Sequence, residues 1–426
     1  MGCRTYHDPL HGSIHLDDGD PAEAMVLGLV ESRPFQRLRR VRQLGPAFLT
    51  FHGAESSRFT HSLGVFHLAR RALGKLLPMD PSLERHKCVL YGAALLHDLG
   101  HAPLSHTGEE MFGLHHEAWS ARLVREHPEV QPLLESNGEG TAEAVALLLE
   151  EGKAERGVIK ALVSSQLDCD RLDYLMRDSH STGARYGQLD LDRILGALTL
   201  APDGDLAIHP KGLMAVEHYL VVRNLMYRSV YTHRLNVVCN WMLEQVVQLA
   251  RRLGEQQVWT DAVMAQWLWD SAAVTPDVFL ANDDLRTGYH LQRWAEEAPA
   301  PLAHLCSRFL NRQLFKATNV AGMSTEQQLE ALALARRLTE AASMDPELCC
   351  GLRHQQLRGY HPYRGGLRLW DGTMLRGLEQ TSSLISSLSK PAGTAWLIHP
   401  REIQDALRQE LELNPQENSG IEIHGA

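Results

Sequence analysis

A chain of 426 residues with 44% hydrophobic residues can bury a large core, in two or three domains or in one large helical domain with appendages. Its formal net charge of −10 argues against a surface built for non-specific nucleic-acid binding, which needs dense basic patches. The longest apolar runs are about half of what a bilayer span needs and no signal-peptide pattern is found, so we expect a cytoplasmic protein that binds neither membrane nor nucleic acid.

The cysteines indicate the redox compartment of the protein, and the histidines indicate its chemistry. The seven cysteines are scattered without the C-x-x-C pairs of zinc sites, which fits reduced thiols in the cytoplasm. Histidine is unusually plentiful, with 23 residues, and several histidines lie beside carboxylates. Such combinations make the chain a candidate for metal binding or proton transfer.

The N-terminal region predicts a hairpin followed by a helix. Residues 4–16 have the pattern of two short strands around a turn at Pro9 and Gly12. Residues 22–43 have helical apolar spacing, interrupted near Arg33-Pro34. Their basic end is either a solvated helix face, which is the commoner case, or a phosphate contact. This basic end consists of Arg37, Arg39, Arg40 and Arg42.

Helices and a histidine-rich segment follow. The pattern predicts a helix over 57–77, ended by Pro78, and the unbroken apolar run 88–96 predicts a buried helix. That run leads directly into the segment His97-Asp98-Leu99-Gly100-His101, and another helix is expected to begin at 115–117. Residues 128–157 are acidic and contain glycine, so we interpret them as a surface excursion.

The middle of the chain predicts two longer helices around a hairpin at 198–208. The first helix covers 158–178, and the spacing of Asp170, Tyr174 and Arg177 places them on one face. That face is either an exposed row of ion pairs or functional. The second helix runs from about 214 to 253 and ends at Gly254. It carries a stripe that suits either a bound nucleotide or a neighbouring packed element: Arg223, Tyr227, Tyr231 and Arg234.

The last part of the chain begins helical and ends mixed. Residues 256–343 keep a helical pattern, whereas 359–363 and 367–372 indicate strands and turns. A closing strand is expected at 395–398 and a helix over 401–413, with frayed residues beyond 414.

The His97-Asp98 segment requires compensation for its polar groups. Burying a carboxylate and several imidazoles without partners is costly, and a divalent cation would compensate them. His61 alone would more often be a hydrogen-bonded core histidine than a ligand. Together, His61, His97, Asp98 and Asp170 supply two imidazoles and two carboxylates from three helices.

These residues fall into a longer series of motifs that resembles a known family, the HD-domain metal-dependent phosphohydrolases. Within it, the sequence resembles the deoxynucleoside triphosphate triphosphohydrolases, which include the vertebrate SAM-and-HD-domain enzyme; no SAM domain is expected here. The resemblance covers roughly residues 4–250. Its motifs are Asp8-Pro9-Leu10-His11-Gly12, Phe35-Gln36-Arg37-Leu38-Arg39, Gln43-Leu44-Gly45, Arg58-Phe59-Thr60-His61-Ser62-Leu63-Gly64-Val65, His97-Asp98-Leu99-Gly100-His101, Asp173-Tyr174, Arg177-Asp178 and Tyr231-x-His233-Arg234.

The resemblance implies a role for each matching position. The metal ligands would be His61, His97, Asp98 and Asp170, holding a divalent ion (Mn, Fe, Mg or Zn). The reaction centre would be lined by His101, His106, His116 and Glu109, the last standing where relatives carry an aspartate. The substrate would contact Arg58, Gln43, Leu44, Arg171, Tyr174, Asp178 and Arg223. The stripe described above adds Tyr227 and Tyr231 as candidate substrate contacts.

The implied reaction is hydrolysis of a deoxynucleoside triphosphate at the α-phosphorus, which releases the deoxynucleoside and inorganic triphosphate. Alternatives are an HD phosphohydrolase acting on a monophosphate or an alarmone, and a non-catalytic nucleotide-binding regulator. Family members are often oligomers activated by a second nucleotide, so the resemblance implies a homo-oligomer, dimer or tetramer. Residues matching the regulatory site are Glu31, Gln36, Arg39, Arg312 and Lys316.

The expected architecture is mainly α, with an HD-domain helical core, small β-hairpins and an α+β C-terminal subdomain. We divide it into an N-terminal hairpin and basic helix at 1–49, the HD phosphohydrolase core at 50–254, and a helical, then α+β region at 255–426.

Overall fold

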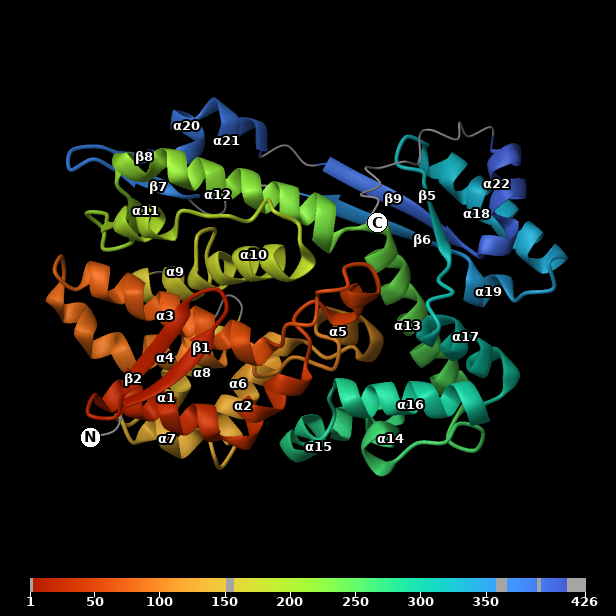
Figure 1. Cartoon of the computed structure of the whole chain (residues 1–426), viewed down its shortest axis with the longest axis horizontal. Coiled ribbons are helices and arrows are strands. Elements are labelled where there is room, and N and C mark those ends of the chain that lie inside the picture. The colour runs from red at the N-terminus through yellow and green to blue at the C-terminus, as the bar shows by residue number, and fades with distance from the viewer. Residues whose placement is uncertain (1–2, 151–156, 358–365, 389–391, 412–426) are drawn as a thin grey trace. The chain divides into compact units, whose positions relative to one another are not determined.

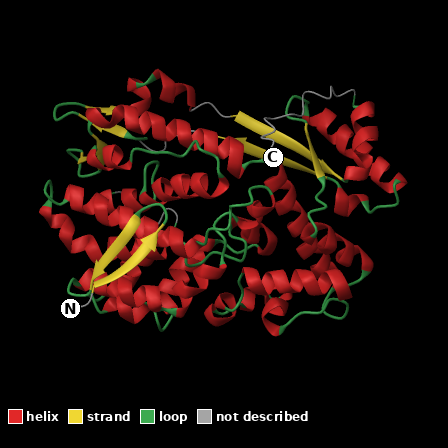
Figure 2. Cartoon of the chain, viewed as in Figure 1, coloured by secondary structure: helices red, strands yellow, loops and turns green. Residues whose placement is uncertain are grey.

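Figure 1 shows a computed structural model of the chain, which describes residues 3–150, 157–357, 366–388 and 392–411. Its residues form two compact units. The first unit comprises residues 1–230, 260–290 and 358–390, and the second comprises 231–259, 291–357 and 391–426. These units do not follow the three domains expected above, whose boundaries stay a prediction. The described residues are mainly helical with small sheets, as Figure 2 shows, and the expected fold class is confirmed.

The first unit surrounds its helical core with two small sheets. One sheet is the hairpin β1–β2, and the other has the strand order β3-β4-β7-β8. The N-terminal elements are β1 (Cys3–Asp8), β2 (Gly12–Asp17), α1 (Pro21–Glu31), α2 (Arg33–Arg37), α3 (Arg58–Leu76), α4 (Lys87–Leu96), α5 (His106–Phe112), α6 (His116–Glu126), α7 (Gln131–Glu135) and α8 (Thr141–Leu149). The later ones are α9 (Val158–Val163), α10 (Cys169–Thr182), α11 (Leu191–Gly196), β3 (Leu198–Leu200), β4 (Leu206–Ile208), α12 (Leu213–Met226), α14 (Ala262–Trp269), α15 (Pro276–Leu280), β7 (Arg368–Trp370), β8 (Leu375–Gly377), α20 (Leu378–Thr381) and α21 (Ser383–Leu388).

Helix α3 lies at the centre of the first unit because it packs against both α4 and α10. Its Phe66 and Leu73 are fully buried, as are Leu90 and Leu95 of α4. The two helices expected over 57–77 and 88–96 are therefore confirmed, as are the N-terminal hairpin, the hairpin at 198–208 and the helix that begins at 116.

The acidic segment 128–157 is not a surface excursion, and that prediction is wrong for its described part. Helix α8 packs against α4 and α6, and its Val145 and Ala146 are fully buried. The one acidic residue of α8, Glu143, lies on the exposed side of an amphipathic helix, while its alanine, valine and leucine positions complete the core. Residues 151–156 lie outside the described residues.

Two predicted helices are each interrupted. The segment 158–178 forms α9 and α10, because Asp168 leaves the helical conformation and its side chain accepts a hydrogen bond from Arg171 N at 2.7 Å as an N-cap. The helix expected over 214–253 ends as α12 at Met226, continues as a π-helical turn over Tyr227–Tyr231, and restarts as α13 (Arg234–Leu253). Gly254, with φ of +78°, ends α13 as expected.

The second unit is a three-stranded sheet with helices. The strand order is β5-β9-β6, and both β5 and β6 pair antiparallel with β9. The segment 256–343 was expected to be helical throughout, but it contains β5, which is completed by pairing with a strand some 80 residues away that no local pattern reveals. The elements of this unit are α13, α17 (Ala300–Leu310), β5 (Lys316–Asn319), α18 (Thr325–Ala341), α19 (Pro346–Cys349), β6 (Gly351–Leu357), β9 (Ala392–His399) and α22 (Gln404–Glu410). Helix α16 (Asp284–Glu297) contributes residues to both units.

A small apolar core holds the second unit together. Ala335 of α18, Leu397 of β9 and Leu407 of α22 are fully buried and belong to one cluster. Helix α18 begins with a capping box, in which Ser324 and Gln327 bond reciprocally. The expected closing strand and final helix are confirmed, whereas the predicted strand at 359–363 and the residues beyond 411 lie outside the described residues.

The buried His399 of β9 predicts an acid-sensitive stability. Burial lowers the pKa of His399 to about 4, against about 6.5 in an unfolded chain. Between these values the unfolded state binds a proton that the folded state does not, so the free energy of unfolding should fall as pH falls from 6.5 to 4. We expect His399→Gln to reduce that slope by up to about 1.4 kcal/mol per pH unit in urea unfolding. The exposed His180→Gln is the control, and equal slopes in both variants would contradict the expectation.

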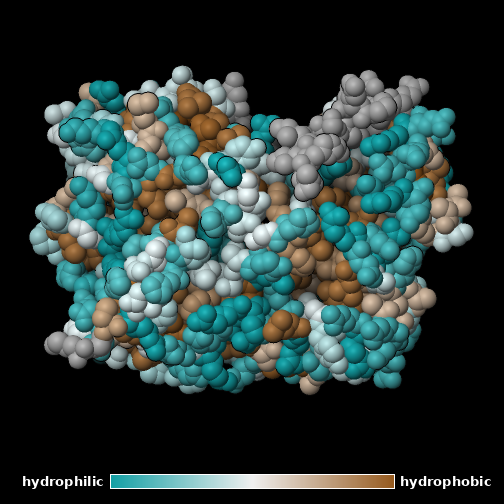
Figure 3. Space-filling view, viewed as in Figure 1, coloured by the Kyte–Doolittle hydropathy of each residue, from teal (hydrophilic) through white to brown (hydrophobic). Residues whose placement is uncertain are grey.

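The surface in Figure 3 is a mosaic of hydrophilic and hydrophobic residues, with hydrophobic residues gathered over α20 and α21. Leu384 of α21 has 45% of its surface exposed. Among the residues that the structure describes, none of the helices combines the length and the apolar character that crossing a bilayer requires.

Candidate metal centre and active site

Three helices of the first unit bring the four expected metal ligands to one point. His61 lies in the first turn of α3, His97 directly follows α4, and Asp170 lies in the first turn of α10. His61 Nε2 is 3.0 Å from Asp170 Oδ1 and 3.2 Å from His97 Nε2. Asp98 completes the group, because its Oδ2 is 3.5 Å from His61 Nε2 and its Oδ1 is 3.3 Å from His97 Nε2. We call these four residues the HD cluster.

The hydrogen bonds around the HD cluster fit a bound cation. His61 Nδ1 donates to Asp173 Oδ2 at 2.8 Å, and His97 Nδ1 donates to the carbonyl of Ala94 at 3.0 Å. With Nδ1 as the donor in each ring, the neutral form of both rings would offer a bound cation a lone pair on each Nε2, and the two Nε2 atoms lie 3.2 Å apart. A divalent metal would accept both, and histidine ligands are commonly oriented by such a bond from the second ring nitrogen.

The electrostatics of the HD cluster also favour positive charge. Burial opposes protonation of His61, yet the hydrogen bonds to Asp170 and Asp173 raise its pKa to about 10. Burial likewise opposes ionisation of Asp98, but the Arg58 guanidinium and the His97 imidazole hold the pKa of that carboxyl well below its usual range. The cluster therefore keeps ionised carboxylates in a buried place, where a divalent cation would balance them.

A buried hydrogen-bond network behind His61 fixes the orientation of its ring. The sequence analysis assigns no function to the residues of this network. Asp173 accepts hydrogen bonds from His61, from His11 Nε2 at 2.6 Å, and from Arg177 Nε at 2.7 Å. Arg177 Nη1 also donates to Asp8 Oδ2 at 2.9 Å. Asp8, His11, Asp173 and Arg177 all stand in the motifs of the family resemblance, so the motifs themselves were the available signal.

Gly64 of α3 faces this network. Replacing a glycine within a helix by alanine usually stabilises the protein, but at Gly64 we expect the opposite. A Cβ on Gly64 would overlap the Asp173 carboxylate and lie 2.6 Å from Arg177 Nη2, whereas a Cβ on Gly74 of the same helix meets nothing within 4 Å. We therefore expect Gly64→Ala to destabilise the protein by at least about 2 kcal/mol. Gly74→Ala should stabilise it by up to about 1 kcal/mol. Thermal unfolding of both variants tests this, and a change of the same sign in the two would contradict it.

A second cluster lies beside the first and contains the expected proton-transfer groups. Glu109 Oε1 is 2.5 Å from His116 Nδ1, 3.3 Å from His101 Nδ1 and 3.5 Å from His106 Nδ1. The rings of His101 and His116 stack with centroids 4.0 Å apart. We call these four residues the Glu109 cluster. The Glu109 carboxylate thus reaches all three histidines.

His101 connects the two clusters. Its Nε2 is 3.1 Å from Asp98 Oδ1, while its Nδ1 faces Glu109. Burial, together with the nearby Arg58 and His116, lowers the pKa of His101 well below its ordinary value, so this ring is neutral. Burial opposes ionisation of Glu109, but hydrogen bonds from His106 and His116 hold its pKa well below the usual range. The donor atoms of the Glu109 cluster lie within 4.8 Å of one another, so this cluster could also hold an ion.

The expected substrate contacts near α3 are buried or partly buried, and Arg58 is hydrogen-bonded within the protein. Arg58 is buried and donates to Asp98 Oδ2 at 2.5 Å, to Ser105 Oγ at 2.7 Å and to the carbonyl of Gln43 at 3.3 Å. The Gln43 side chain is buried, and its Oε1 has no hydrogen-bond partner within the protein. Leu44 follows in the same loop and is partly buried.

The expected substrate contacts on α10 and α12 form a second group in the first unit. Arg171 pairs with Asp168, and Arg223 Nη1 donates to Gln166 Oε1 at 2.8 Å. The hydroxyls of Tyr174 and Tyr227 are 3.5 Å apart, and Asp178 is buried one turn after Tyr174. Tyr231 belongs to the second unit. The structure therefore brings together the members on α10 and α12.

The expected regulatory residues fall into both units. Glu31 forms an ion pair with Arg4, and both line a hollow of about 600 Å³ beside β1 and α1. Gln36 Oε1 accepts a hydrogen bond from Arg39 Nε at 2.8 Å, and the Arg39 guanidinium lies 3.5 Å from the centre of the Phe59 ring. Arg312 and Lys316 belong to the second unit, at the end of α17 and the start of β5.

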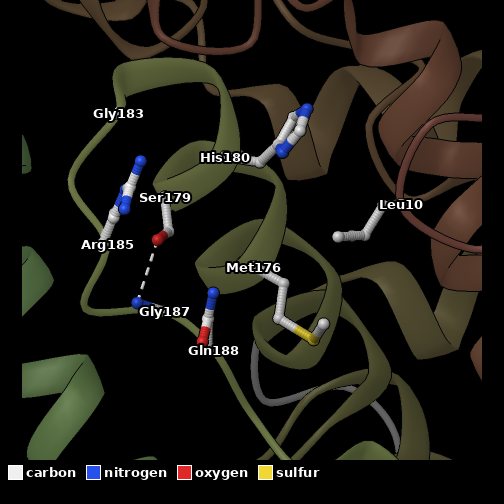
Figure 4. A pocket seen from close by; sticks show the side chains of 8 residues that line it. All are labelled: Leu10, Met176, Ser179, His180, Gly183, Arg185, Gly187 and Gln188. Atoms are coloured by element: carbon white, nitrogen blue, oxygen red, sulfur yellow. Dashed lines mark hydrogen bonds between the residues drawn. The ribbon is translucent and has the colours of Figure 1, made fainter.

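A further hollow of about 490 Å³ lies along α10 (Figure 4). Its lining residues Met176, Ser179 and His180 lie on a different face of α10 from Asp170 and Tyr174. Ser179 Oγ accepts a hydrogen bond from Gly187 N at 2.9 Å, and Leu10 points into the hollow between Met176 and His180. This hollow is therefore not the metal centre.

In the first unit, two histidines and two aspartates from three helices lie around one point. This arrangement is typical of a metal-dependent HD-type hydrolase. Comparison with known proteins agrees, since the HD domain family matches residues 58–178 and the HD associated region matches residues 189–349. The chain belongs to the HD-domain phosphohydrolase family and is related to its deoxynucleoside triphosphate triphosphohydrolases. HD domains bind divalent metals, which agrees with the donor set of the HD cluster.

Three relatives illustrate this membership. The uncharacterized protein YwfO of Bacillus subtilis is 32% identical over 413 residues, which cover 94% of this chain and 93% of YwfO. The deoxynucleoside triphosphate triphosphohydrolase SAMHD1 of Homo sapiens is 28% identical over 279 residues, 56% of this chain and 43% of that protein. The crystal structure of a phosphohydrolase from Bacteroides thetaiotaomicron matches with a TM-score of 0.82 and 26% identity, covering 94% of this chain and 100% of that one.

Proposed function

We propose that this protein hydrolyses deoxynucleoside triphosphates at the α-phosphorus and releases a deoxynucleoside and inorganic triphosphate. The observation that carries the proposal is the continuous arrangement of the HD cluster, His101 and the Glu109 cluster within one unit. A metal-binding group directly joined to proton-transfer groups suits hydrolysis of a phosphate ester. The similarity to SAMHD1, which is named for this reaction, supports the substrate class.

In this proposal the HD cluster holds one divalent ion (Mn, Fe, Mg or Zn). When bound, such an ion would polarise the α-phosphate and lower the pKa of a bound water. The water oxygen forms a bond to the α-phosphorus, the bond from that phosphorus to the sugar O5′ breaks, and O5′ takes up a proton. His101, His106 and His116 are placed to transfer protons, because each lies within 3.5 Å of the ionised Glu109.

The cationic and phenolic residues of α3, α10 and α12 would bind the substrate. Arg58, Arg171 and Arg223 would hold the triphosphate and offset its charge. Tyr174 would pack under the sugar, where it would exclude a 2′-hydroxyl, beside Asp178 and with Tyr227 within contact distance. Gln43 has a buried side-chain oxygen without a partner, which suits a hydrogen bond to the sugar or base. Leu44 would complete the contacts within the first unit, and a substrate contact of Tyr231 stays a prediction from the sequence.

We further propose activation by a second nucleotide, bound near Arg4, Glu31, Gln36 and Arg39. The hollow of about 600 Å³ lined by Arg4 and Glu31 supports this. The family resemblance implies a nucleotide bound between subunits, where Arg312 and Lys316 would contact its phosphates. A homo-oligomer, dimer or tetramer, follows from the same resemblance. Seven free cysteines support a place in the cytoplasm.

Product analysis by anion-exchange chromatography tests the reaction. The protein is incubated with each of the four deoxynucleoside triphosphates, with Mn²⁺ or Mg²⁺, and with or without GTP. We expect the wild type to release inorganic triphosphate and deoxynucleoside in equal amounts. The double variant His97→Ala/Asp98→Ala should release neither product. Inorganic pyrophosphate or orthophosphate as the product would contradict cleavage of the bond between the α-phosphorus and O5′.

The same experiment separates the alternatives. Turnover of a nucleoside monophosphate or an alarmone, but of no triphosphate, would indicate another HD phosphohydrolase. Nucleotide binding in calorimetry without any turnover would indicate a regulator. The Glu109 cluster argues against the regulator, because a protein that only binds needs no proton-transfer groups beside its metal ligands.

A further inference from the structure

The loop that leads from His101 to His106 has an unusual backbone that something must hold in place. Leu104 and Ser105 have φ of +61° and +59°, a region that residues other than glycine rarely adopt. The loop connects one member of the Glu109 cluster to another, because α5 begins at His106 and carries Glu109. The placement of His106 and Glu109 therefore depends on what fixes Leu104 and Ser105.

The segment 282–284, which lies within the HD associated region and outside the HD domain match, supplies that support. It stands between α15 and the start of α16, and its three consecutive polar residues are buried: Asn282 is 0% exposed, and Asp283 and Asp284 are each 7% exposed. All three belong to the same compact unit as the HD cluster.

Asp284 binds two loops of the site with its two carboxylate oxygens. Oδ1 accepts a hydrogen bond from Leu104 N at 2.7 Å, and Oδ2 accepts one from Arg42 N at 2.9 Å. Arg42 directly precedes Gln43 and Leu44, which we propose as substrate contacts. The two loops are also joined to each other, because Ser105 Oγ donates to the carbonyl of Arg42 at 2.5 Å.

Two more contacts make the connection continuous. Arg37 is almost fully buried and donates from Nε to the carbonyl of Asn282 at 2.8 Å and from Nη1 to the carbonyl of His101 at 2.9 Å. Ser105 Oγ in turn accepts a hydrogen bond from Arg58, which is paired with Asp98. The segment 282–284 thus reaches both ends of the loop from His101 to His106.

We propose that Asp284 is a positioning residue of the active site, which holds the 101–106 loop and the Gln43 loop in the geometry that the reaction requires. The inference rests on the proposed function for its kinetic consequence only. Asparagine at this position has a single acceptor oxygen, so it can bind one of the two backbone N–H groups and turns its NH₂ group toward the other. Asp284→Asn should therefore release one loop without changing the volume of the side chain.

Asp283→Asn is the matched control. Asp283 is equally buried, but its carboxylate pairs with Arg40 at 2.5 Å and caps α16 through Leu285 N and Arg286 N, both at 3.1 Å. Among the described residues, its carboxylate forms no hydrogen bond with either loop. Loss of folded protein alone would therefore affect the two variants alike and would leave KM unchanged.

In steady-state hydrolysis of a deoxynucleoside triphosphate by the full chain, we expect Asp284→Asn to lower kcat by about 100-fold and to raise KM, while Mn²⁺ affinity in calorimetry stays within about twofold of the wild type. Asp283→Asn should keep kcat and KM within about twofold. Equal kinetic effects of the two variants, or loss of Mn²⁺ binding in Asp284→Asn, would overturn the proposal.

Hydrogen exchange decides the question independently of the substrate. We expect amide exchange to be about tenfold faster in at least one of the peptides covering 41–45 and 100–106 in Asp284→Asn, and unchanged in both peptides in Asp283→Asn. A wild type without turnover would contradict the proposed function and leave this measurement intact. Unchanged exchange in Asp284→Asn would overturn the role of Asp284 whatever the reaction is.

Discussion

Asp170→Asn should abolish tight Mn²⁺ binding and lower kcat/KM by at least about 10³-fold. Asp170 Oδ1 lies 3.0 Å from His61 Nε2 and 3.6 Å from His97 Nε2, so this oxygen would share a metal with both rings. Burial opposes ionisation of Asp170, but hydrogen bonds from His61 and His97 hold its pKa far below the usual range. Asparagine keeps the shape of the side chain but removes one negative charge from the cluster. That charge would stabilise a bound divalent ion.

Calorimetry with Mn²⁺ and the triphosphate-release assay measure the two effects separately. Asp192→Asn is the control, because Asp192 lies on α11 of the same unit and pairs with Arg71 at the surface, with 88% of its side chain exposed. It should bind Mn²⁺ and turn over substrate as the wild type does. An Asp170→Asn protein that keeps both properties would show that the HD cluster is not the metal site.

Local patterns predict the helix ends at which His61 and His97 lie, whereas Asp170 was expected inside one helix over 158–178 and lies at the start of α10. The apolar run before His97 predicts a buried helix, and α4 does end at Leu96. The match of His61 and Asp170 to a family motif then supplies what spacing alone does not, namely which helix ends meet. The neighbouring His11 and Asp173 stand in the same motifs, yet their contact spans 162 residues of sequence and no periodicity reveals it.

The errors in the fold have a common physical cause. The segment 141–149 has one acidic residue, the exposed Glu143, and burial of its opposite face against α4 and α6 determines its structure. The break between α12 and α13 falls in a stretch of good helical periodicity, where the π-helical turn at Tyr227–Tyr231 shifts the register of the predicted stripe. Tertiary packing overrides a local preference in both cases.

Asp284 could not be found from the sequence for a related reason. Two aspartates before an amphipathic helix are typical of an N-cap, and Asp283 does cap α16. The adjacent carboxylate instead bonds to backbone N–H groups 180 and 242 residues earlier in the chain. A backbone partner leaves no signature in the side chains that a motif records.

Glu109→Gln should lower kcat by about 10² to 10³-fold while leaving KM and the Mn²⁺ affinity of the HD cluster unchanged. Glu109 Oε1 contacts His101, His106 and His116, and its negative charge stabilises a proton on whichever of these rings carries it during the reaction. Glutamine can still accept a hydrogen bond from His116 but provides no charge. Among the described residues, Glu109 forms no ion pair with a member of the HD cluster, so metal binding there should persist.

Glu110→Gln is the matched control, since Glu110 is the next residue of α5 and is exposed. Equal kcat values in the two variants would contradict a role of the carboxylate in proton transfer.

The number of Mn²⁺ ions bound in calorimetry then distinguishes the two uses that the Glu109 cluster could have. One ion per chain in both the wild type and Glu109→Gln fits proton transfer alone. Two ions in the wild type and one in Glu109→Gln would place a second metal among His101, His106, Glu109 and His116, and the kinetic loss would then follow from its removal.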